Sequence, residues 1–328
     1  MLRPYPKWMK QIELGSSGVK VSSLGIGTWA WGDNLYWGYG KGYGENDLQL
    51  AFDETLRAGI DFFDTAEIYG FGKSEKFIGE FLRVAAQRDG ASIRDSVHIA
   101  TKFACLPYRV TKSSLLRALR GSLKRLGVAQ VDLYQIHWNF AAMSIETMMD
   151  AMAEAVEKNL TRAVGVSNYN VEQVRRAYKR LAAHNIPLAS NQIEYNLLQR
   201  GAEFNGMVET CRELNITIIA YSPLKFGVLT GKYSPSNPLP GARGRQFSVA
   251  YLAQIEPFMV ELKKVAQKYD KSIPQVAINW VMQRGAIPIP GAKNLKQAQE
   301  NAGALGWNLA REDVEFLNEM STRVHAAR

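Results

Sequence analysis

The chain has 328 residues, of which 46% are hydrophobic and 22% charged, and it carries a net charge of +9. This composition is typical of a globular protein, and no stretch approaches the roughly 18 consecutive apolar residues of a membrane span, so we expect no membrane insertion. The basic residues lie mostly on helical patterns, as at Arg175, Arg176, Lys179 and Arg180, with no recognised nucleic-acid-binding motif beside them. We therefore expect no nucleic-acid partner.

The first predicted elements are a tail over residues 1–10 and a hairpin over residues 11–21. The tail contains Arg3 and Lys7 but no apolar core of signal-peptide length, so nothing marks the chain for secretion. The hairpin consists of two alternating runs around Gly15–Gly18. We expect it to close the bottom of the fold that follows.

Eight apolar, β-branched runs of strand length follow at similar intervals, each succeeded by a segment with helical periodicity. The runs are Ser23–Thr28, Ile60–Thr65, Val97–Phe103, Val131–Trp138, Arg162–Ser167, Ala189–Glu194, Ile216–Ser222 and Ala286–Pro290. Continuous apolar strands are buried on both faces, whereas strands of a half-solvated sheet alternate between polar and apolar residues. The sequence therefore predicts an α/β fold, a (β/α)8 TIM barrel, in a single domain spanning residues 1–328.

A long segment separates the seventh and eighth predicted strands. Residues 225–246 within it are rich in glycine, proline and serine. We expect a long loop over residues 223–250 that can act as a lid over the barrel.

Two nucleotide-binding motifs are matched only superficially. Gly25–Ala30 fits G-x-G-x-x-A, but the chain continues into a glycine- and aromatic-rich stretch where that motif needs a helix. The segment from Gly227 to Tyr233 resembles a P-loop but has three residues between its glycines where a P-loop has four. Neither motif therefore predicts a phosphate site.

No metal site or disulfide is predicted. Cys105 and Cys211 lie too far apart for a metal-binding or redox spacing, and they indicate reduced thiols. The four histidines are scattered along the chain, at positions 98, 137, 184 and 325.

Ionisable residues stand at the carboxyl ends of three adjacent predicted strands, where TIM barrels place their chemistry. They are Asp64, Lys102 and His137, and Tyr69 follows five residues after Asp64. Each alone has a structural explanation, such as an ion pair or a core histidine. Together they suit proton transfer: a lysine lowers the pKa of a nearby phenol, a carboxylate keeps that lysine charged, and a histidine orients a carbonyl.

The three motifs that carry these four residues resemble the catalytic tetrad of the aldo-keto reductases. They are Asp-Thr-Ala-Glu-Ile-Tyr-Gly at 64–70, Thr-Lys-Phe at 101–103 and Gln-Ile-His-Trp at 135–138, and the resemblance extends from the hairpin to about Leu317. Gly-Thr-Trp-Ala-Trp-Gly at 27–32 and Gly-Ala-Leu-Gly-Trp at 303–307 are similar to the pyridoxal-reductase-like branch, which includes plant chloroplast members. The resemblance implies hydride transfer from NAD(P)H to an aldehyde or ketone, with Tyr69 as the general acid.

The same resemblance implies where the cofactor binds. The nicotinamide would lie on Tyr221, and Ser167, Asn168 and Gln192 would hold its carboxamide. Its pyrophosphate would be lined by Ser222, Leu224, Gly227, Leu229 and Lys232, and the far end would be bound by Gly291, Lys293, Gln297, Glu300 and Asn301. Because Lys293 precedes a predicted helix N-terminus with no carboxylate close by in sequence, we expect NADPH in preference to NADH.

Aromatic residues after the first, second and fourth strands predict an aromatic substrate pocket. They are Trp29, Trp31, Trp37, Phe71 and Trp138. Such walls suit aromatic or heteroaromatic aldehydes such as pyridoxal, and small reactive carbonyls such as methylglyoxal. We expect a small carbonyl substrate as the partner of a monomer or weak homo-oligomer in the cytoplasm, or in the plastid stroma if a transit peptide has been removed.

One alternative has a different function. Some barrels of this family are NADP(H)-binding regulatory subunits with slow turnover, and an intact tetrad does not distinguish such a redox sensor from a reductase. Repeated turnover with an aldehyde distinguishes the two, because a reductase cycles and a sensor stalls. A metal- or phosphate-dependent lyase or isomerase is disfavoured, because no cluster of acidic ligands accompanies the strand ends.

Overall fold

Eight parallel strands form the centre of the protein, which is described by a computed structural model covering residues 10–138, 140 and 142–326. The strands are β3 (Gly25–Gly27), β4 (Phe62–Asp64), β5 (His98–Phe103), β6 (Val131–Ile136), β7 (Thr161–Ser167), β8 (Leu188–Glu194), β9 (Thr217–Tyr221) and β10 (Ile287–Ile289). They pair in chain order from β3 to β10. A bridge between Gly27 and Gly291, together with a hydrogen bond from the Gly27 N–H to the Pro290 carbonyl (3.0 Å), closes the sheet into a barrel.

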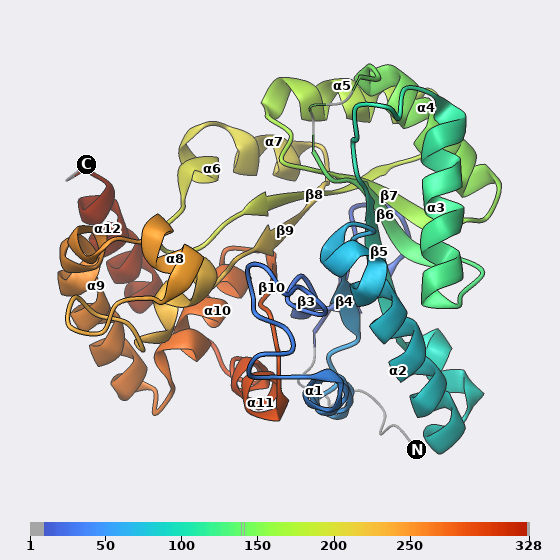
Figure 1. The fold of residues 1–328 in the computed structure, drawn as a ribbon. Helices are drawn as coiled ribbons and strands as arrows, with labels where there is room; N and C mark the ends of the chain where they lie inside the picture. Colours follow the sequence, from blue (N-terminus) through green and yellow to red (C-terminus); the bar gives the residue numbers. More distant parts are fainter. Residues whose placement is uncertain (1–9, 139, 141, 327–328) are drawn as a thin grey trace.

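Helices surround this barrel (Figure 1). Those that follow the strands are α1 (Glu45–Arg57), α2 (Lys73–Asp89), α3 (Lys112–Leu126), α4 (Ile145–Glu157), α5 (Val171–Ala182), α6 (Gly201–Phe204), α7 (Met207–Glu213), α10 (Ile273–Gln283) and α11 (Leu295–Ala302). Two further helices, α9 (Val249–Lys268) and α12 (Arg311–Ala326), pack against each other beside the barrel (Figure 1). The prediction of a (β/α)8 barrel is confirmed.

The predicted strands coincide with the observed ones apart from their ends. Six predicted runs contain the whole observed strand, and β7 and β8 each begin one residue earlier than predicted. The first predicted run, Ser23–Thr28, is reduced to three residues in β3. Local signals also fix helix ends: the Asn170 side chain accepts a hydrogen bond from the Gln173 N–H (2.9 Å) at the start of α5, and Gly127 ends α3 in a left-handed conformation (φ 67°).

The amino-terminal hairpin closes one end of the barrel. Its strands β1 (Gln11–Glu13) and β2 (Lys20–Ser22) pair antiparallel. Leu14, Val19 and Val21 pack with inward-facing strand residues in an apolar cluster that is separate from the main core. The other members of this cluster include Phe62, Ala100, Leu133, Ala163, Ala189, Ile219 and Ile287. The predicted hairpin and its position at the barrel bottom are confirmed.

The long segment after β9 has more regular structure than the sequence predicted. It contains two short helices, η3 (Lys225–Thr230) and α8 (Gly241–Gln246), and its predicted end overlaps α9. The overlap arises because Ser248 caps α9, its hydroxyl accepting from the Tyr251 N–H (3.2 Å). The other short helices are η1 (Tyr69–Gly72) and η2 (Ala91–Ser96). Among the described residues, no helix combines the length and apolar character that crossing a bilayer requires.

Buried charges join the strands at the hairpin end. Asp132 lies between Arg162 Nη1 (2.9 Å), His98 Nδ1 (3.2 Å) and the Ile99 N–H (2.9 Å). Burial alone would raise the pKa of Asp132, but the hydrogen bonds from His98 and Ile99 and the charges of His98 and Arg94 outweigh it and lower that pKa. A carboxyl with a lowered folded-state pKa stabilises the fold above its unfolded-state pKa, and this stabilisation is lost as pH falls through the folded-state value.

Asp132→Asn is therefore expected to lower the free energy of unfolding at pH 7 by about 1–3 kcal/mol, the effect of losing hydrogen bonds to a charged group. The difference from wild type should shrink as pH falls below about 4. Urea denaturation of both proteins at several pH values measures this difference in the free energy of unfolding. Glu319→Gln, which breaks an exposed pair with Arg323, is the control and should change stability by less than about 0.5 kcal/mol. A difference that is the same at every pH would contradict the linkage to Asp132.

Candidate active site

The four residues of the predicted tetrad lie at the end of the barrel opposite the hairpin. Asp64 is the last residue of β4, Lys102 the fifth of β5, and His137 follows β6 directly. Tyr69 begins η1, in the loop that leaves β4. Because neighbouring parallel strands end at the same edge, these side chains come together although they are far apart in sequence.

Lys102 is the centre of the group. Its ammonium donates hydrogen bonds to the Asp64 carboxylate and to the Thr65 carbonyl (2.8 Å), and its Nζ lies 3.4 Å from the Tyr69 hydroxyl. The Lys102 side chain is fully buried. Burial lowers the pKa of Lys102, while the adjacent Asp64 carboxylate acts in the opposite direction and favours the ammonium.

The pKa of the Tyr69 phenol differs from the prediction. Lys102 was expected to lower the phenol pKa, but burial and the Asp64 carboxylate raise it well above its usual value. The contact with Lys102 is long, at 3.4 Å, and the lysine charge is already neutralised by Asp64, so burial dominates. The phenol therefore stays protonated at neutral pH, which is the form a proton donor requires.

His137 faces Tyr69 across the site. The two rings meet edge to face with centroids 5.6 Å apart, and Trp138 stacks on the imidazole at 3.8 Å. Burial, reinforced by the Lys102 charge, lowers the pKa of His137 well below its usual value. The imidazole is therefore neutral at neutral pH and carries one N–H. Its buried Nδ1 has no hydrogen-bond partner among the described residues.

Two glutamine side chains hold Asp64 from the barrel interior. Gln192 Nε2 donates to Asp64 Oδ2 (2.7 Å), and Gln135 Nε2 reaches the same oxygen (3.2 Å). Gln192 was predicted to hold a carboxamide, but here its amide N–H group contacts the tetrad. Gln135 was missed by the sequence reasoning. The signal was available, because Gln135 lies two residues before His137 and strand side chains alternate between faces.

A chain of hydrogen bonds crosses the ends of β7, β8 and β9. Ser167 Oγ donates to the Gln192 carbonyl (2.9 Å), and Asn168 Nδ2 donates to Ser167 Oγ (3.1 Å). The Tyr221 hydroxyl donates to Asn168 Oδ1 (3.0 Å). Burial, with the charge of Glu194, raises the pKa of Tyr221 to about 12. The structure thus brings these four predicted cofactor residues together beside the tetrad.

The predicted pyrophosphate residues differ in how they are exposed. Leu229 is fully buried in the main core, which leaves only its backbone for contact with a ligand. Gly227 has a positive φ (96°), and the Ser222 carbonyl accepts a hydrogen bond from Asn196 Nδ2 (3.0 Å). Leu224 is partly buried against the core.

Three cations gather on aromatic rings beyond this segment. Lys293 Nζ lies 4.9 Å from the ring centroid of Tyr43 and 5.6 Å from that of Trp37, and Arg243 Cζ lies 5.5 Å from the Trp37 centroid. Burial lowers the pKa of Lys293, and the charges of Arg243 and Lys232 lower it further. None of the three forms an ion pair with a carboxylate in the part of the chain that the structure describes. This cluster, Lys232, Arg243 and Lys293, is suited to an anion.

Arg243 was not predicted. It lies on α8, within residues 223–250, for which a long loop was expected. Its Nη1 donates to the Phe226 carbonyl (3.3 Å). Its position 50 residues before Lys293 gave no sign that the two side chains meet at one ring. Only the folded path of the segment brings it there.

The remaining predicted cofactor residues lie on or beside α11. Asn294 caps the helix by accepting from the Gln297 N–H (3.0 Å), while the Gln297 side chain accepts from the Lys293 N–H (2.9 Å). Glu300 accepts a hydrogen bond from the Ser272 hydroxyl, and Asn301 Nδ2 donates to the Gly291 carbonyl (3.2 Å). These contacts hold the β10–α11 turn in place.

Aromatic side chains cover the tetrad. The rings of Tyr36 and Trp29 stack at 5.1 Å, and Trp29 also lies 6.3 Å from Tyr69 and 6.2 Å from Phe226. Trp37 meets Trp29 edge to face at 5.5 Å. The cover therefore joins the loop after β3 to the long segment after β9.

Two of the predicted pocket residues do not join this aromatic cover. Trp31 is fully buried in the main core, packs on Phe63 and Phe81, and donates its indole N–H to the Ala292 carbonyl (2.8 Å). The prediction that it lines the pocket is wrong, because the turn after β3 directs its side chain outward between strand and helix. The Phe71 side chain is 92% exposed and forms no ring contact among the described residues.

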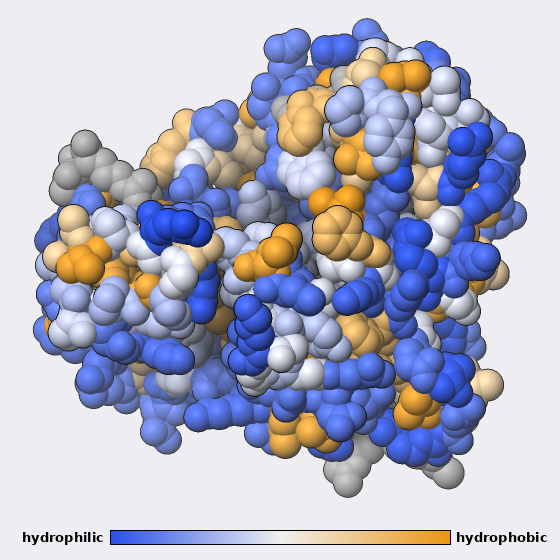
Figure 2. Space-filling view, in the orientation of Figure 1, coloured by the Kyte–Doolittle hydropathy of each residue, from blue (hydrophilic) through white to orange (hydrophobic). Residues whose placement is uncertain are grey.

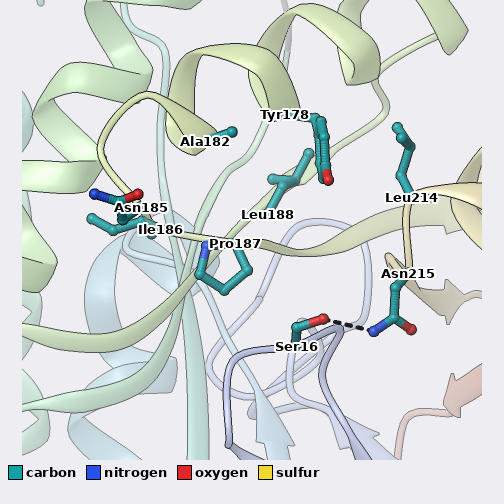
Figure 3. Close-up of a pocket in the computed structure, with 9 residues that line it drawn as sticks. All are labelled: Ser16, Tyr178, Ala182, Asn185, Ile186, Pro187, Leu188, Leu214 and Asn215. Atoms are coloured by element: carbon teal, nitrogen blue, oxygen red, sulfur yellow. Dashed lines mark hydrogen bonds between the residues drawn. The ribbon is translucent and has the colours of Figure 1, made fainter.

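A surface groove of about 340 Å³ lies at the other end of the barrel (Figure 3). It is lined by the loops that enter β8 and β9 and by Ser16 of the hairpin, which accepts a hydrogen bond from Asn215 Nδ2 (2.7 Å). Its position separates it from the tetrad. On the face shown in Figure 2, apolar residues form small separate groups among hydrophilic ones.

Comparisons with known proteins show which family the chain resembles. Residues 23–322 match the model of the aldo/keto reductase family. The chain is 40% identical over 313 residues to the chloroplastic pyridoxal reductase of Arabidopsis thaliana, covering 93% of this chain and 84% of that protein. It is 27% identical over 339 residues to the NADH-specific methylglyoxal reductase of Escherichia coli, covering 95% and 98% of the two chains.

A solved structure shares the fold as well. The aldo-keto reductase of Klebsiella pneumoniae in complex with NADPH superimposes with a TM-score of 0.73 at 25% identity, covering 95% of each chain. The match of the family model to nearly the whole barrel, together with the similarity to the plant enzyme, shows that this chain belongs to the aldo-keto reductase family of NAD(P)H-dependent oxidoreductases.

Proposed function

We propose that the protein reduces aldehydes and ketones to alcohols, with NADPH as the hydride donor and Tyr69 as the proton donor. The observation that carries this proposal is the convergence of Lys102 Nζ, 3.4 Å from the Tyr69 hydroxyl, with a His137 ring that meets the same phenol edge to face. A hydride added to the carbonyl carbon and a proton added to its oxygen complete the reduction.

Each tetrad residue has a separate task. Tyr69 supplies its phenolic proton to the carbonyl oxygen, and the Lys102 ammonium stabilises the phenolate that remains. Asp64 keeps Lys102 charged within a buried site, and Gln135 and Gln192 hold the carboxylate in place. The neutral His137 can donate its N–H to the carbonyl and orient it.

The residues beside the tetrad fit a nicotinamide nucleotide. Tyr221 offers an aromatic face, and Ser167 and Asn168 offer neutral polar groups suited to a carboxamide. The side-chain amide nitrogen of Gln192 donates to Asp64, so its side-chain amide oxygen is the group that could accept a hydrogen bond from the carboxamide. When bound, the nucleotide supplies the hydride. Ser222, Leu224, Gly227 and Leu229 would line its pyrophosphate, with Lys232 neutralising the charge.

The cation cluster supports NADPH as the preferred cofactor. Lys232, Arg243 and Lys293 bring three positive charges together. They lie beside the N-terminus of α11, where the Gln297 N–H is bound by Asn294 and the positive end of the helix favours an anion. An additional phosphate would relieve their mutual repulsion. Relatives differ in cofactor, since the Escherichia coli protein is named as NADH-specific and the Klebsiella pneumoniae structure holds NADPH.

The aromatic cover supports planar aldehydes as substrates. Trp29 lies against Tyr69, and Trp138 stacks on His137, so both reacting side chains are flanked by an indole. The similarity to a pyridoxal reductase and to a methylglyoxal reductase favours pyridoxal, benzaldehydes and small dicarbonyls.

A panel of aldehydes with NADPH tests the proposal. Wild type should turn over on the order of once per second or faster. Trp29→Ala should raise KM for benzaldehyde and pyridoxal by about 3- to 10-fold, the effect of losing a ring pair worth about 0.5–1.5 kcal/mol, and should change methylglyoxal reduction much less.

Trp307→Ala is the matched control for this panel. Trp307 lies in the segment between α11 and α12, where it packs on Tyr269 and donates to the Gly303 carbonyl (3.0 Å). It should leave the aldehyde preference of the enzyme unchanged. Activity with sugars alone, or a single turnover followed by arrest, would contradict the proposed function.

A further inference from the structure

An ion pair joins the loop that carries Tyr69 to the loop that follows Lys102. Arg109 donates two hydrogen bonds to the Glu67 carboxylate, one to Oε1 and one to Oε2 (3.0 Å). The Ala104 N–H also donates to Glu67 Oε1 (2.7 Å), and Arg109 Nη1 reaches the Ala104 carbonyl (3.1 Å). Two parallel N–H···O bonds fix orientation as well as distance.

This pair is sheltered from solvent. The side chains of Glu67 and Arg109 are 7% and 18% exposed, and Arg109 Cζ lies 5.3 Å from the ring centroid of Phe103. The same loop reaches the histidine side of the site, because Cys105 Sγ donates to the Trp138 carbonyl (3.0 Å). The loops that follow β4, β5 and β6 are thus linked through side chains that the tetrad does not use.

Tyr69 needs support from its backbone, because its own polar contact is weak. The Lys102–Tyr69 distance of 3.4 Å is at the long limit of a hydrogen bond. On its carboxyl side, three consecutive residues have left-handed backbone, namely Gly70 (φ 55°), Phe71 (φ 56°) and Gly72 (φ 85°). Phe71 points into solvent and adds no packing. On the amino side, Glu67 lies two residues away and holds the chain through its ion pair with Arg109.

We propose that Glu67, held by Arg109 and the Ala104 amide, is a positioning residue that keeps the Tyr69 phenol within reach of Lys102 and the reacting carbonyl. This inference rests on the proposed function of Tyr69. Glu67 touches neither substrate nor cofactor in this role. Its effect passes through the backbone between residues 67 and 69, so its removal should lower kcat and leave cofactor binding unchanged.

Steady-state kinetics of Glu67→Gln test the proposal. The amide keeps an acceptor for the Ala104 N–H and removes the charge that binds Arg109. We expect kcat for pyridoxal to fall on the order of 10- to 100-fold, as a misplaced reacting group does, while the Kd for NADPH stays the same. Arg109→Met should behave alike, and the double variant should be no worse than the poorer single one, because both remove one interaction.

A pair of similar burial far from the tetrad provides the control. Glu203 accepts from Arg200 Nε (3.1 Å) and Nη2 (2.7 Å), with side chains 9% and 6% exposed. Glu203→Gln should lower Tm by an amount similar to Glu67→Gln and leave kcat unchanged. Arg109→Lys retains a single charged donor, so its kcat should lie between those of Arg109→Met and wild type. This variant keeps the proposal testable if Glu67→Gln folds poorly.

Fluorine NMR separates this inference from the proposed function. With 3-fluorotyrosine incorporated in place of Tyr69, the resonance should broaden or split in Glu67→Gln and Arg109→Lys, and should match wild type in Glu203→Gln. A response of the resonance in an enzyme that reduces no aldehyde would support the positioning role and reject the function. An unchanged resonance with unchanged kcat would overturn the positioning role.

Discussion

Replacing Tyr69 by phenylalanine is expected to lower kcat for aldehyde reduction by about 10²- to 10⁴-fold, the usual contribution of a positioned general acid. Burial and the Asp64 charge raise the phenol pKa, so wild-type Tyr69 carries its proton through neutral pH and the loss should appear at every such pH. Stopped-flow measurement of NADPH oxidation with pyridoxal reports the chemical step directly.

The same variant should bind NADPH as wild type does, because the Tyr69 hydroxyl contacts only Lys102 among the described residues. Tyr108→Phe is the matched control: this phenol is 75% exposed on the neighbouring loop, and its removal should leave kcat unchanged. If Tyr69→Phe kept more than about a tenth of wild-type kcat, general acid catalysis by this phenol would be rejected.

The barrel was predictable because its signals are local. Strands buried on both faces tend to be continuously apolar, as the run Ala286–Pro290 around β10 is, and this pattern can be recognised in the sequence without knowing which strands are neighbours. The tetrad positions were predictable for a related reason. Once the strands are known, parallel topology alone places the residues after β4, β5 and β6 at one edge.

Side-chain direction and charge balance were not predictable. The sequence does not show which way the chain turns after β3, and so Trp29 covers Tyr69 while Trp31, two residues later, is buried among Phe63 and Phe81. The phenol pKa depends on two opposing effects, burial and a partly neutralised lysine, whose balance appears only in three dimensions. Arg243 was missed because its partners are distant in sequence.

Removing the cation cluster is expected to change cofactor preference. Arg243→Ala and Lys293→Ala should each weaken NADPH binding by about 10- to 100-fold, as expected for hydrogen bonds to a charged group worth about 1.5–3 kcal/mol. NADH lacks the additional phosphate, so its Kd should change much less. Quenching of protein fluorescence by each nucleotide, titrated side by side, gives the ratio of the two dissociation constants.

Arg245→Ala is the control, because Arg245 is an exposed residue on the same short helix as Arg243 and forms no ring contact among the described residues. It should leave both dissociation constants unchanged. Wild-type binding of NADPH should also weaken with rising salt more steeply than binding of NADH, since salt screens the charge of the extra phosphate. Equal losses of affinity for NADPH and NADH in Arg243→Ala and Lys293→Ala would assign the cluster to the pyrophosphate. Tighter binding of NADH than of NADPH by wild type would reject the NADPH preference.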